Sequence, residues 1–153
     1  MEQKIEAILR RTRRAVVTIA PDASLQTAAR LMNRERIGSL VVVDEADNIA
    51  GILSERDVLR GFADADADIR DMEVRRIMTH REKMIVGQSS DSVGQLMAVM
   101  TRNQIRHIPI LSRDEPYRFI GMISIGDLVN ARLSDSHTEN RFLRDYIAGT
   151  YPG

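Results

Sequence analysis

The sequence predicts an α/β (α+β) fold in which a strand–helix–strand–strand–helix unit is built twice. The first observation is a repeated motif: Gly-Ile-Leu-Ser-Glu-Arg-Asp at 51–57 returns as Gly-Met-Ile-Ser-Ile-Gly-Asp at 121–127, 70 residues later. The second is a serine-led apolar pattern at 24–32 that returns at 92–100, 68 residues later. Self-similarity at a nearly fixed period indicates one structural unit in two copies, usually related by a pseudo-twofold axis. A chain of 153 residues can hold two half-size units that share one core.

The elements of the first copy follow from residue spacing and turn chemistry. Apolar side chains at helical spacing among arginines predict an amphipathic helix over 2–13 that leads into the first unit. Strands are expected over the β-branched run 16–19 and the apolar run 40–43, and a turn at 44–48 leads to a returning strand over 49–53. Ser54 begins a helix to about Phe62. Ser24 is typical of a helix N-cap, and one apolar stripe follows it: Leu25, Ala28, Ala29 and Met32.

The second copy repeats this order, with strands over 84–86, 107–111 and 119–123 and helices over 92–102 and 124–133. Residues 63–73 are acidic and alanine-rich, which is typical of a solvated linker or a loose helix. Aromatic and apolar side chains at helical spacing over 139–147 are expected to pack on the body or on another subunit. The predicted organisation is an N-terminal helix (1–14), a first unit (15–63), a linker (64–76), a second unit (77–134) and a C-terminal helical tail (135–153).

Composition argues against several classes of partner. Acidic and basic side chains balance, 22 to 22, so an extended nucleic-acid-binding surface is not expected. The absence of cysteine excludes disulfides and thiolate chemistry, and no apolar run approaches the roughly 18–20 residues that cross a bilayer. Residues 1–14 are charged where a signal peptide is apolar. We therefore expect a cytoplasmic protein that binds neither membrane nor nucleic acid.

Catalysis is not expected either. The sequence has no nucleophile–base pair at a recognisable spacing, no cluster of metal ligands and no phosphate-binding loop with lysine. Asp64, Asp66 and Asp68 alternate with alanine, but the glycine and terminal glutamate of a calcium loop are missing, so we interpret them as linker. The prediction is a chain that is not an enzyme and holds no metal or catalytic cofactor.

The repeated Gly-x-x-Ser-x-x-Asp motif lies where a strand meets a helix. The glycine lets a ligand or a neighbouring backbone come close, and Ser54 and Ser124 stand at helix N-termini, which favour an anion such as phosphate. Asp57 and Asp127 follow one turn later and suit a pair of vicinal hydroxyls, so the motif fits a ribose phosphate. Ser-x-x-Asp is also a capping box. The motif recurs with the same preceding glycine. This favours the ligand interpretation, because a helix cap needs neither the glycine nor the repetition.

The tandem unit with its two Gly-x-x-Ser-x-x-Asp motifs resembles a pair of cystathionine-β-synthase (CBS) domains, a Bateman module, over nearly everything from Val16 to Leu133. Residues 105–109, Ile-Arg-His-Ile-Pro, match the family pattern as well. The resemblance implies two units packed sheet to sheet with helices outside, adenosyl nucleotides in the two clefts between them, and modules paired as homodimers. It implies a regulatory, energy-sensing role through AMP, ADP, ATP or NAD. The alternative is a structural or interaction module with empty clefts that regulates an unknown protein partner.

The resemblance also implies which residues form each cleft, with the Ser and Asp of one unit facing the other unit. One cleft would combine Ser54, Arg56 and Asp57 with Met84, Ile85, Arg106, His107 and Pro109. The other would combine Ser124 and Asp127 with Val17, Thr18, Ile37, Gly38 and Ser39. Apolar residues would clamp the adenine, the aspartate would hold the ribose, and serine or a basic group would meet phosphate.

The two clefts are not expected to be equal. The first has Arg106 and His107 where the second has Gly38 and Ser39, and Gly126 replaces Arg56 in the second motif. Charge-assisted hydrogen bonds are roughly twice as strong as neutral ones, so the first cleft should hold phosphate better. An aspartate on the ribose disfavours a 2′-phosphate, which makes NADP the least expected ligand.

Overall fold

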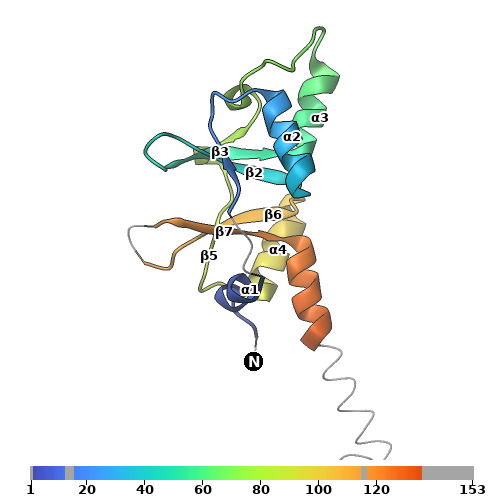
Figure 1. Ribbon diagram of the computed structural model, residues 1–153. Coiled ribbons are helices and arrows are strands. Elements are labelled where there is room, and N and C mark those ends of the chain that lie inside the picture. Colours follow the sequence, from blue (N-terminus) through green and yellow to red (C-terminus); the bar gives the residue numbers. More distant parts are fainter. Residues whose placement is uncertain (1, 13–15, 115–116, 136–153) are drawn as a thin grey trace, which may run out of the picture. The chain divides into compact units, whose positions relative to one another are not determined.

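The computed structural model describes residues 2–12, 16–114 and 117–135, and the helix predicted over 139–147 lies outside them. The described chain forms two compact units (Figure 1). One consists of residues 16–85, and the other consists of residues 2–12, 86–114 and 117–135. Each contains the predicted strand–helix–strand–strand–helix order, so the mixed α and β fold is confirmed.

The first unit is a four-stranded sheet covered by two helices. Its strand order is β1-β2-β3-β4, with β1 parallel to β2 and the other neighbours antiparallel. The strand β4 and the two short 3-10 turns beside it were not predicted. The elements are β1 (Thr18–Ile19), α2 (Leu25–Glu35), β2 (Ser39–Val43), β3 (Ile49–Ser54), α3 (Glu55–Asp64), η1 (Val74–Arg76), β4 (Thr79–His80) and η2 (Arg81–Lys83).

The second unit has a three-stranded sheet in the order β5-β6-β7, with β5 parallel to β6 and β7 antiparallel to it. Its elements are α1 (Ile5–Thr12), β5 (Gly87–Gln88), α4 (Val93–Asn103), β6 (His107–Leu111), β7 (Phe119–Ser124) and a helix over 125–135. The strand predicted over 84–86 is wrong, because pairing with β6 begins only at Gly87. A Cβ at Gly87 would lie 3.0 Å from Ile110 and 3.1 Å from Leu96, so the bare backbone lets this strand pass close to its neighbours.

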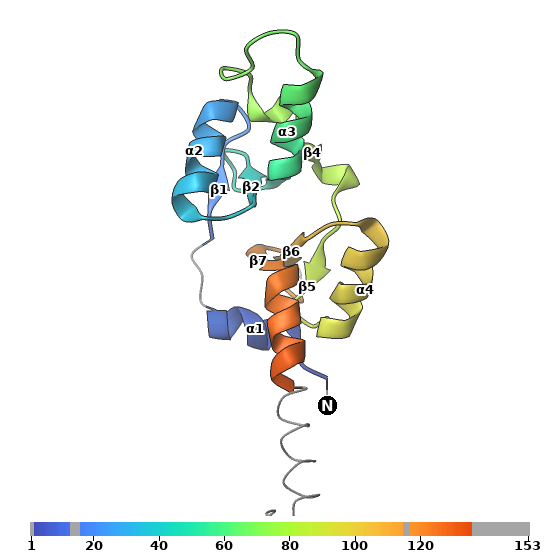
Figure 2. The same cartoon turned by 90° about the vertical axis from the view of Figure 1, so that its right-hand side faces the viewer.

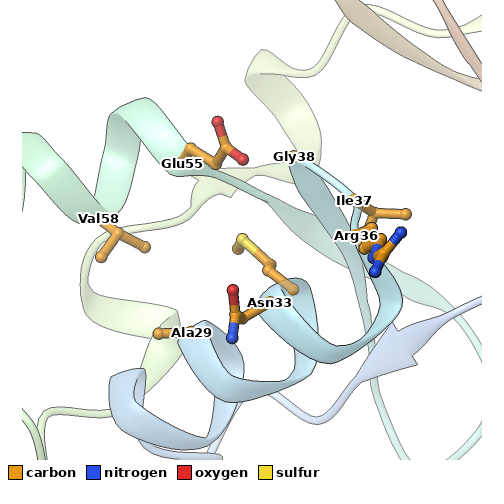
Figure 3. Close-up of a pocket in the computed structure, with 8 residues that line it drawn as sticks. Ala29, Asn33, Arg36, Ile37, Gly38, Glu55 and Val58 are labelled. Atoms are coloured by element: carbon orange, nitrogen blue, oxygen red, sulfur yellow. The ribbon is translucent and has the colours of Figure 1, made fainter.

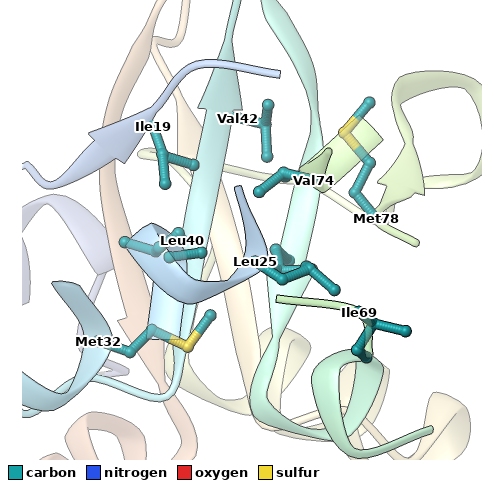
Figure 4. Close-up of a cluster of buried hydrophobic side chains, with 10 residues drawn as sticks. Ile19, Leu25, Met32, Leu40, Val42, Ile69, Val74 and Met78 are labelled. Atoms are coloured by element: carbon teal, nitrogen blue, oxygen red, sulfur yellow. The ribbon is translucent and has the colours of Figure 1, made fainter. Parts of the chain in front are cut away.

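The core of the first unit corrects two expectations (Figure 4). Leu25, Ala28 and Met32 are buried as predicted, but Ala29 is exposed. The segment 63–73 is not fully solvated, because Ile69 is 7% exposed. Val74, within the linker predicted over 64–76, is fully buried. The alternation of aspartate and alanine gives the segment a polar composition, although a few of its apolar side chains reach the core. In its exposed part, Asp68 accepts a hydrogen bond from Arg70, which lowers the pKa of Asp68.

The helix predicted over 2–13 is confirmed as α1, but it packs in the second unit and not in the first. The amide of Ile5 donates to the carbonyl of Asp91 at 2.9 Å, and that of Val93 donates to Gln3 at 3.1 Å. An isolated bridge joins Lys4 to Ser92. In Figures 1 and 2, α1 is grouped with α4 and with the helix over 125–135, which belong to the same unit. The chain order therefore did not reveal which unit this helix completes.

The first unit has an equivalent set of contacts with residues 72–74. The amide of Val74 donates to Ala23 at 2.8 Å, that of Leu25 donates to Met72 at 2.9 Å, and a bridge joins Ser24 to Glu73. Residues 3–9 and 72–78 therefore occupy corresponding places, 69 positions apart in the sequence. Each precedes one repeat in the sequence and packs on the other repeat. We call them the exchanged segments.

Candidate functional site

The first Ser-x-x-Asp motif forms a reciprocal cap on α3. Ser54 is the last residue of β3 and the N-cap of the helix, and its Oγ accepts from the amide of Asp57 at 3.1 Å. In return, Oδ2 of Asp57 accepts from the amide of Ser54 at 2.9 Å. The other oxygen of Asp57 lies 3.9 Å from Arg60, and the aspartate side chain is 12% exposed. The capping role, one of the two alternatives from the sequence, is therefore realised.

The second motif has the same geometry. Ser124 Oγ accepts from Asp127 N at 3.1 Å, and Asp127 Oδ2 accepts from Ser124 N at 2.9 Å. Asp127 is only 7% exposed, so this carboxylate is withdrawn from water beside a helix N-terminus. A carboxylate accepts at about four lone-pair positions, so capping is compatible with further hydrogen bonds from the hydroxyls of a sugar. The cap therefore does not exclude a ligand.

The glycine of each motif is explained by packing. A Cβ at Gly51 would overlap the carbonyl oxygen of Thr79 and would lie 2.8 Å from Sδ of Met78. A Cβ at Gly121 would lie 2.9 Å from Cδ2 of Leu9. Met78 and Leu9 are the corresponding last residues of the two exchanged segments. The neighbouring chain, and not a ligand, is thus what comes close to each glycine.

One face of the first sheet gathers several predicted site residues. Side chains alternate between the two faces of a strand, and Leu40 and Val42 point into the core shown in Figure 4. Ser39 therefore lies on the opposite face, directly across from Ser54 in the β2–β3 ladder. Thr18 shares this face, because it pairs with Val41.

Ser39 is the unusual member of this face. It is only 5% exposed, and its Oγ is a buried polar side-chain atom without a hydrogen-bond partner among the described residues. Such groups are rare in native proteins and call for an explanation. A ligand that supplies the missing partner would be one.

The second unit places its predicted residues in the same way. His107 pairs with Ser124, as Ser39 pairs with Ser54. The amide of Ile125 donates to Arg106 at 2.8 Å, and that of Glu55 donates to Gly38 at 2.9 Å. Arg106 is exposed, whereas His107 is half-buried and Pro109 is buried. Arg106 thus precedes β6 and His107 begins it, whereas Gly38 precedes β2 and Ser39 begins that strand.

The remaining predicted site residues differ in their burial and in the contacts that they make. Met84 and Ile85 belong to the same compact unit as Ser54 and are half-buried, and Arg56 is exposed on α3. Val17 packs against the first core and so supports it. The combination of residues from both units into shared clefts stays a prediction.

A groove between α2 and α3 was not predicted (Figure 3). It has a volume of about 470 Å³ and is lined by Ala29, Met32, Asn33, Arg36, Ile37, Gly38, Glu55 and Val58. Two of these, Ile37 and Gly38, were predicted for a nucleotide cleft. The sequence contained no signal for this groove, because the apolar spacing placed Ala29 with the buried residues of the stripe, whereas it is exposed. Farther along α3, Leu59 and Phe62 are 68% and 70% exposed.

The described ranges, 2–12, 16–114 and 117–135, lack two kinds of feature. They contain no group of three or more His, Cys, Asp or Glu side chains placed to hold a metal ion. Within the same ranges, no helix combines the length and the apolar character that crossing a bilayer requires.

Sequence comparison matches both repeats. The profile of the CBS domain matches residues 5–64 and 74–134. A mitochondrial CBS domain-containing protein of Arabidopsis thaliana is 37% identical over 132 residues, which are 85% of this chain and 63% of that protein. The chain therefore spans less than two thirds of the length of this relative.

Solved structures share the fold. The crystal structure of a CBS-domain-containing protein from Agrobacterium tumefaciens has a TM-score of 0.78 at 36% identity, covering 86% of this chain and 95% of that one. A CBS domain pair in complex with 5′-methylthioadenosine and S-adenosyl-L-methionine has a TM-score of 0.75 at 20% identity, covering 88% of this chain and 99% of that one. With two profile matches that together cover most of its length, this chain belongs to the CBS-domain family as a tandem pair.

Proposed function

We propose that this chain is a regulatory module that binds an adenine nucleotide, AMP, ADP, ATP or NAD, and catalyses no reaction itself. The observation that carries the proposal is the repeated junction at which a shielded carboxylate, Asp57 or Asp127, stands at a helix N-terminus. The helix end favours phosphate, and the carboxylate offers acceptors to ribose hydroxyls. Support comes from the related CBS pair that was solved with two adenosine-containing ligands.

The proposed sites combine the residues expected from the sequence. In one, Ser54, Arg56 and Asp57 act with Met84, Ile85, Arg106, His107 and Pro109. In the other, Ser124 and Asp127 act with Val17, Thr18, Ile37, Gly38 and Ser39. Because Arg106 and His107 offer charged or ionisable donors, we propose that the first site binds phosphate more tightly. Ser39 contributes its buried hydroxyl, which would gain a partner on the nucleotide.

The test uses a panel of adenine nucleotides and isosteric variants. Thermal shift identifies ligands, because a nucleotide at about 100 times its Kd stabilises the folded protein by roughly 2.7 kcal/mol. Calorimetry then compares wild type with Asp57→Asn and Asp127→Asn. The asparagine carbonyl can still accept the capping bond, but the carboxylate charge and its second acceptor are lost.

We expect each substitution to weaken one site at least tenfold, which is about 1.4 kcal/mol, with little change in melting temperature. Unchanged affinity in both variants would assign the aspartates to capping alone. Absence of binding by every nucleotide would refute the sensor function.

A second candidate function is that of an interaction module, and one observation favours it. No residue of α3 is buried, and Leu59 and Phe62 expose most of their apolar surface. Val129 and Leu133 on the helix over 125–135 are 38% and 50% exposed. Exposed apolar residues at helical spacing mark contact surfaces, and we propose that they pair two copies of this chain as a homodimer.

Sedimentation of wild type against Phe62→Glu tests this candidate, with Arg60→Glu, 65% exposed on the same helix, as the charged control. The dimer proposal requires Phe62→Glu to lower the mass and Arg60→Glu to leave it unchanged. A wild type that sediments as a monomer would exclude it.

A further inference from the structure

The N-terminal exchanged segment packs in the unit that contains the second Ser-x-x-Asp motif. Ile5 and Ile8 are 0% and 1% exposed, and their unit is the one that contains β7 and α4. Leu9 fills the space over Gly121, three residues before Ser124. Residues 16–63, which follow this segment in the sequence, belong to the other unit.

Glu2 contacts α4 and the helix over 125–135, the other two helices of the second unit. Its Oε1 accepts from the amide of Gly94, at the start of α4, at 2.8 Å. The same oxygen lies 3.4 Å from Arg132, on the helix that Ser124 and Asp127 begin. A carboxylate at a helix N-terminus is stabilised by the helix dipole. One side chain outside the motif thus links α4 to the helix that carries Asp127.

The two exchanged segments are not fastened equally. In the first unit the chain continues from Met78 into β4, which pairs with Gly51 and Ile52 of β3. The corresponding residues of the N-terminal segment, Arg10 and Arg11, belong to α1. In the described chain, β7 therefore lacks the fourth-strand neighbour that β3 has. The N-terminal segment relies on buried side chains, a few backbone hydrogen bonds and Glu2.

We propose that residues 2–9 are a latch on the second motif. When the latch is seated, it completes the packing beneath β7 and α4 and holds Ser124 and Asp127 in their capped geometry. When it is withdrawn, the second motif loosens while the first stays formed. Resting on the proposed function, the consequence is regulation: nucleotide affinity at the second motif depends on the seating of this segment, and affinity at the first does not.

Hydrogen exchange of the full chain tests the latch without any ligand. The variant Ile5→Ala/Ile8→Ala is compared with Val74→Ala, which thins the other exchanged segment at a fully buried position. We expect the double variant to raise exchange rates at least tenfold in 119–135 and to leave 16–63 unchanged. Val74→Ala should show the reverse. Faster exchange in 16–63 in the double variant, or equal acceleration throughout, would overturn the proposal.

A milder variant covers the case in which the double variant fails to fold. Glu2→Gln keeps an acceptor for Gly94 but removes the charge beside Arg132, and we expect at least twofold faster exchange confined to 87–96 and 119–135. Unchanged exchange there would count against the latch. Calorimetry of Glu2→Gln with AMP then separates the two proposals. Weaker binding in the Asp57→Asn background, and unchanged binding in the Asp127→Asn background, supports regulation, and equal effects refute it. If wild type binds no nucleotide, the proposed function fails while the exchange result still decides the latch.

Discussion

Replacing each motif glycine by alanine tests whether these positions serve packing or ligand. At Gly51 the new methyl group meets a backbone oxygen and a sulfur 2.8 Å away, so β4 must shift from its pairing with β3. Overpacking of this kind costs about 1–3 kcal/mol, and weakened β4 hydrogen bonds add about 1 kcal/mol. Reduced entropy of the unfolded chain returns about 0.4–1 kcal/mol. We expect Gly51→Ala to lower the free energy of unfolding by about 2–3 kcal/mol.

Gly121→Ala is the matched control at the corresponding position. Its methyl group meets only the end of the Leu9 side chain, at 2.9 Å, and the next atom is 4.0 Å away. Moving that side chain off its rotamer costs about 0.5–1.5 kcal/mol, which the entropy gain nearly offsets. The net change should stay within about 1 kcal/mol.

Urea denaturation followed by circular dichroism measures both variants, and thermal melts provide a second scale. For a chain of this size, 2–3 kcal/mol corresponds to a fall of roughly 4–12 °C in Tm. Equal stability losses in the two variants would refute the packing argument. So would a Gly51→Ala protein of unchanged stability that has lost nucleotide binding, because the glycine would then serve the ligand.

Five further substitutions test single residues. Ser39→Ala should raise the free energy of unfolding by about 1 kcal/mol, because the buried hydroxyl lacks a hydrogen-bond partner. Ser92→Ala should lower this free energy by about 1 kcal/mol, because Ser92 caps α4. Urea denaturation measures both changes. Gln104→Gly should stabilise by about 0.5–1 kcal/mol in the same assay, because Gln104 has a φ of 54°. Ile69→Ala should lower the free energy of unfolding by about 2–5 kcal/mol because this residue is part of the core, whereas a solvated segment over 63–73 would give a loss of less than about 0.5 kcal/mol. Gly126→Arg should tighten AMP binding at the second motif in calorimetry, because a Cβ at Gly126 meets only Ser124 Oγ at 3.5 Å and the arginine restores the donor present at Arg56.

Local features of the fold were predictable because they depend on neighbouring residues. Ser24, Ser54 and Ser92 cap the helices expected from their spacing, and the hairpin between β2 and β3 follows from its turn residues. The strand expected at 84–86 failed because an apolar run does not reveal where a parallel partner begins to pair. Pairing begins instead at Gly87, where the absence of a Cβ lets β5 approach Ile110.

The parts that could not be predicted depend on contacts between distant residues. Composition made 63–73 look solvated, but only the fold brings Ile69, and Val74 just after this segment, to the core beside α2. The partnership of α1 with residues 89–93 is also invisible in chain order. At the candidate site, both aspartates were found from the motif alone, and so was the capping alternative. The unpartnered hydroxyl of Ser39 was not, because its burial depends on the whole fold.

The exchanged segments, 3–9 and 72–78, suggest an origin for this chain. In an ancestor with one repeat, two subunits would have exchanged their N-terminal segments, and gene duplication and fusion would then give this connectivity in one polypeptide. Truncated versions of the chain should be designed with this connectivity in mind. A cut between the two sequence repeats would leave each fragment with the exchanged segment that packs on the other repeat. A fragment of residues 16–85, in contrast, retains the residues that form the first unit.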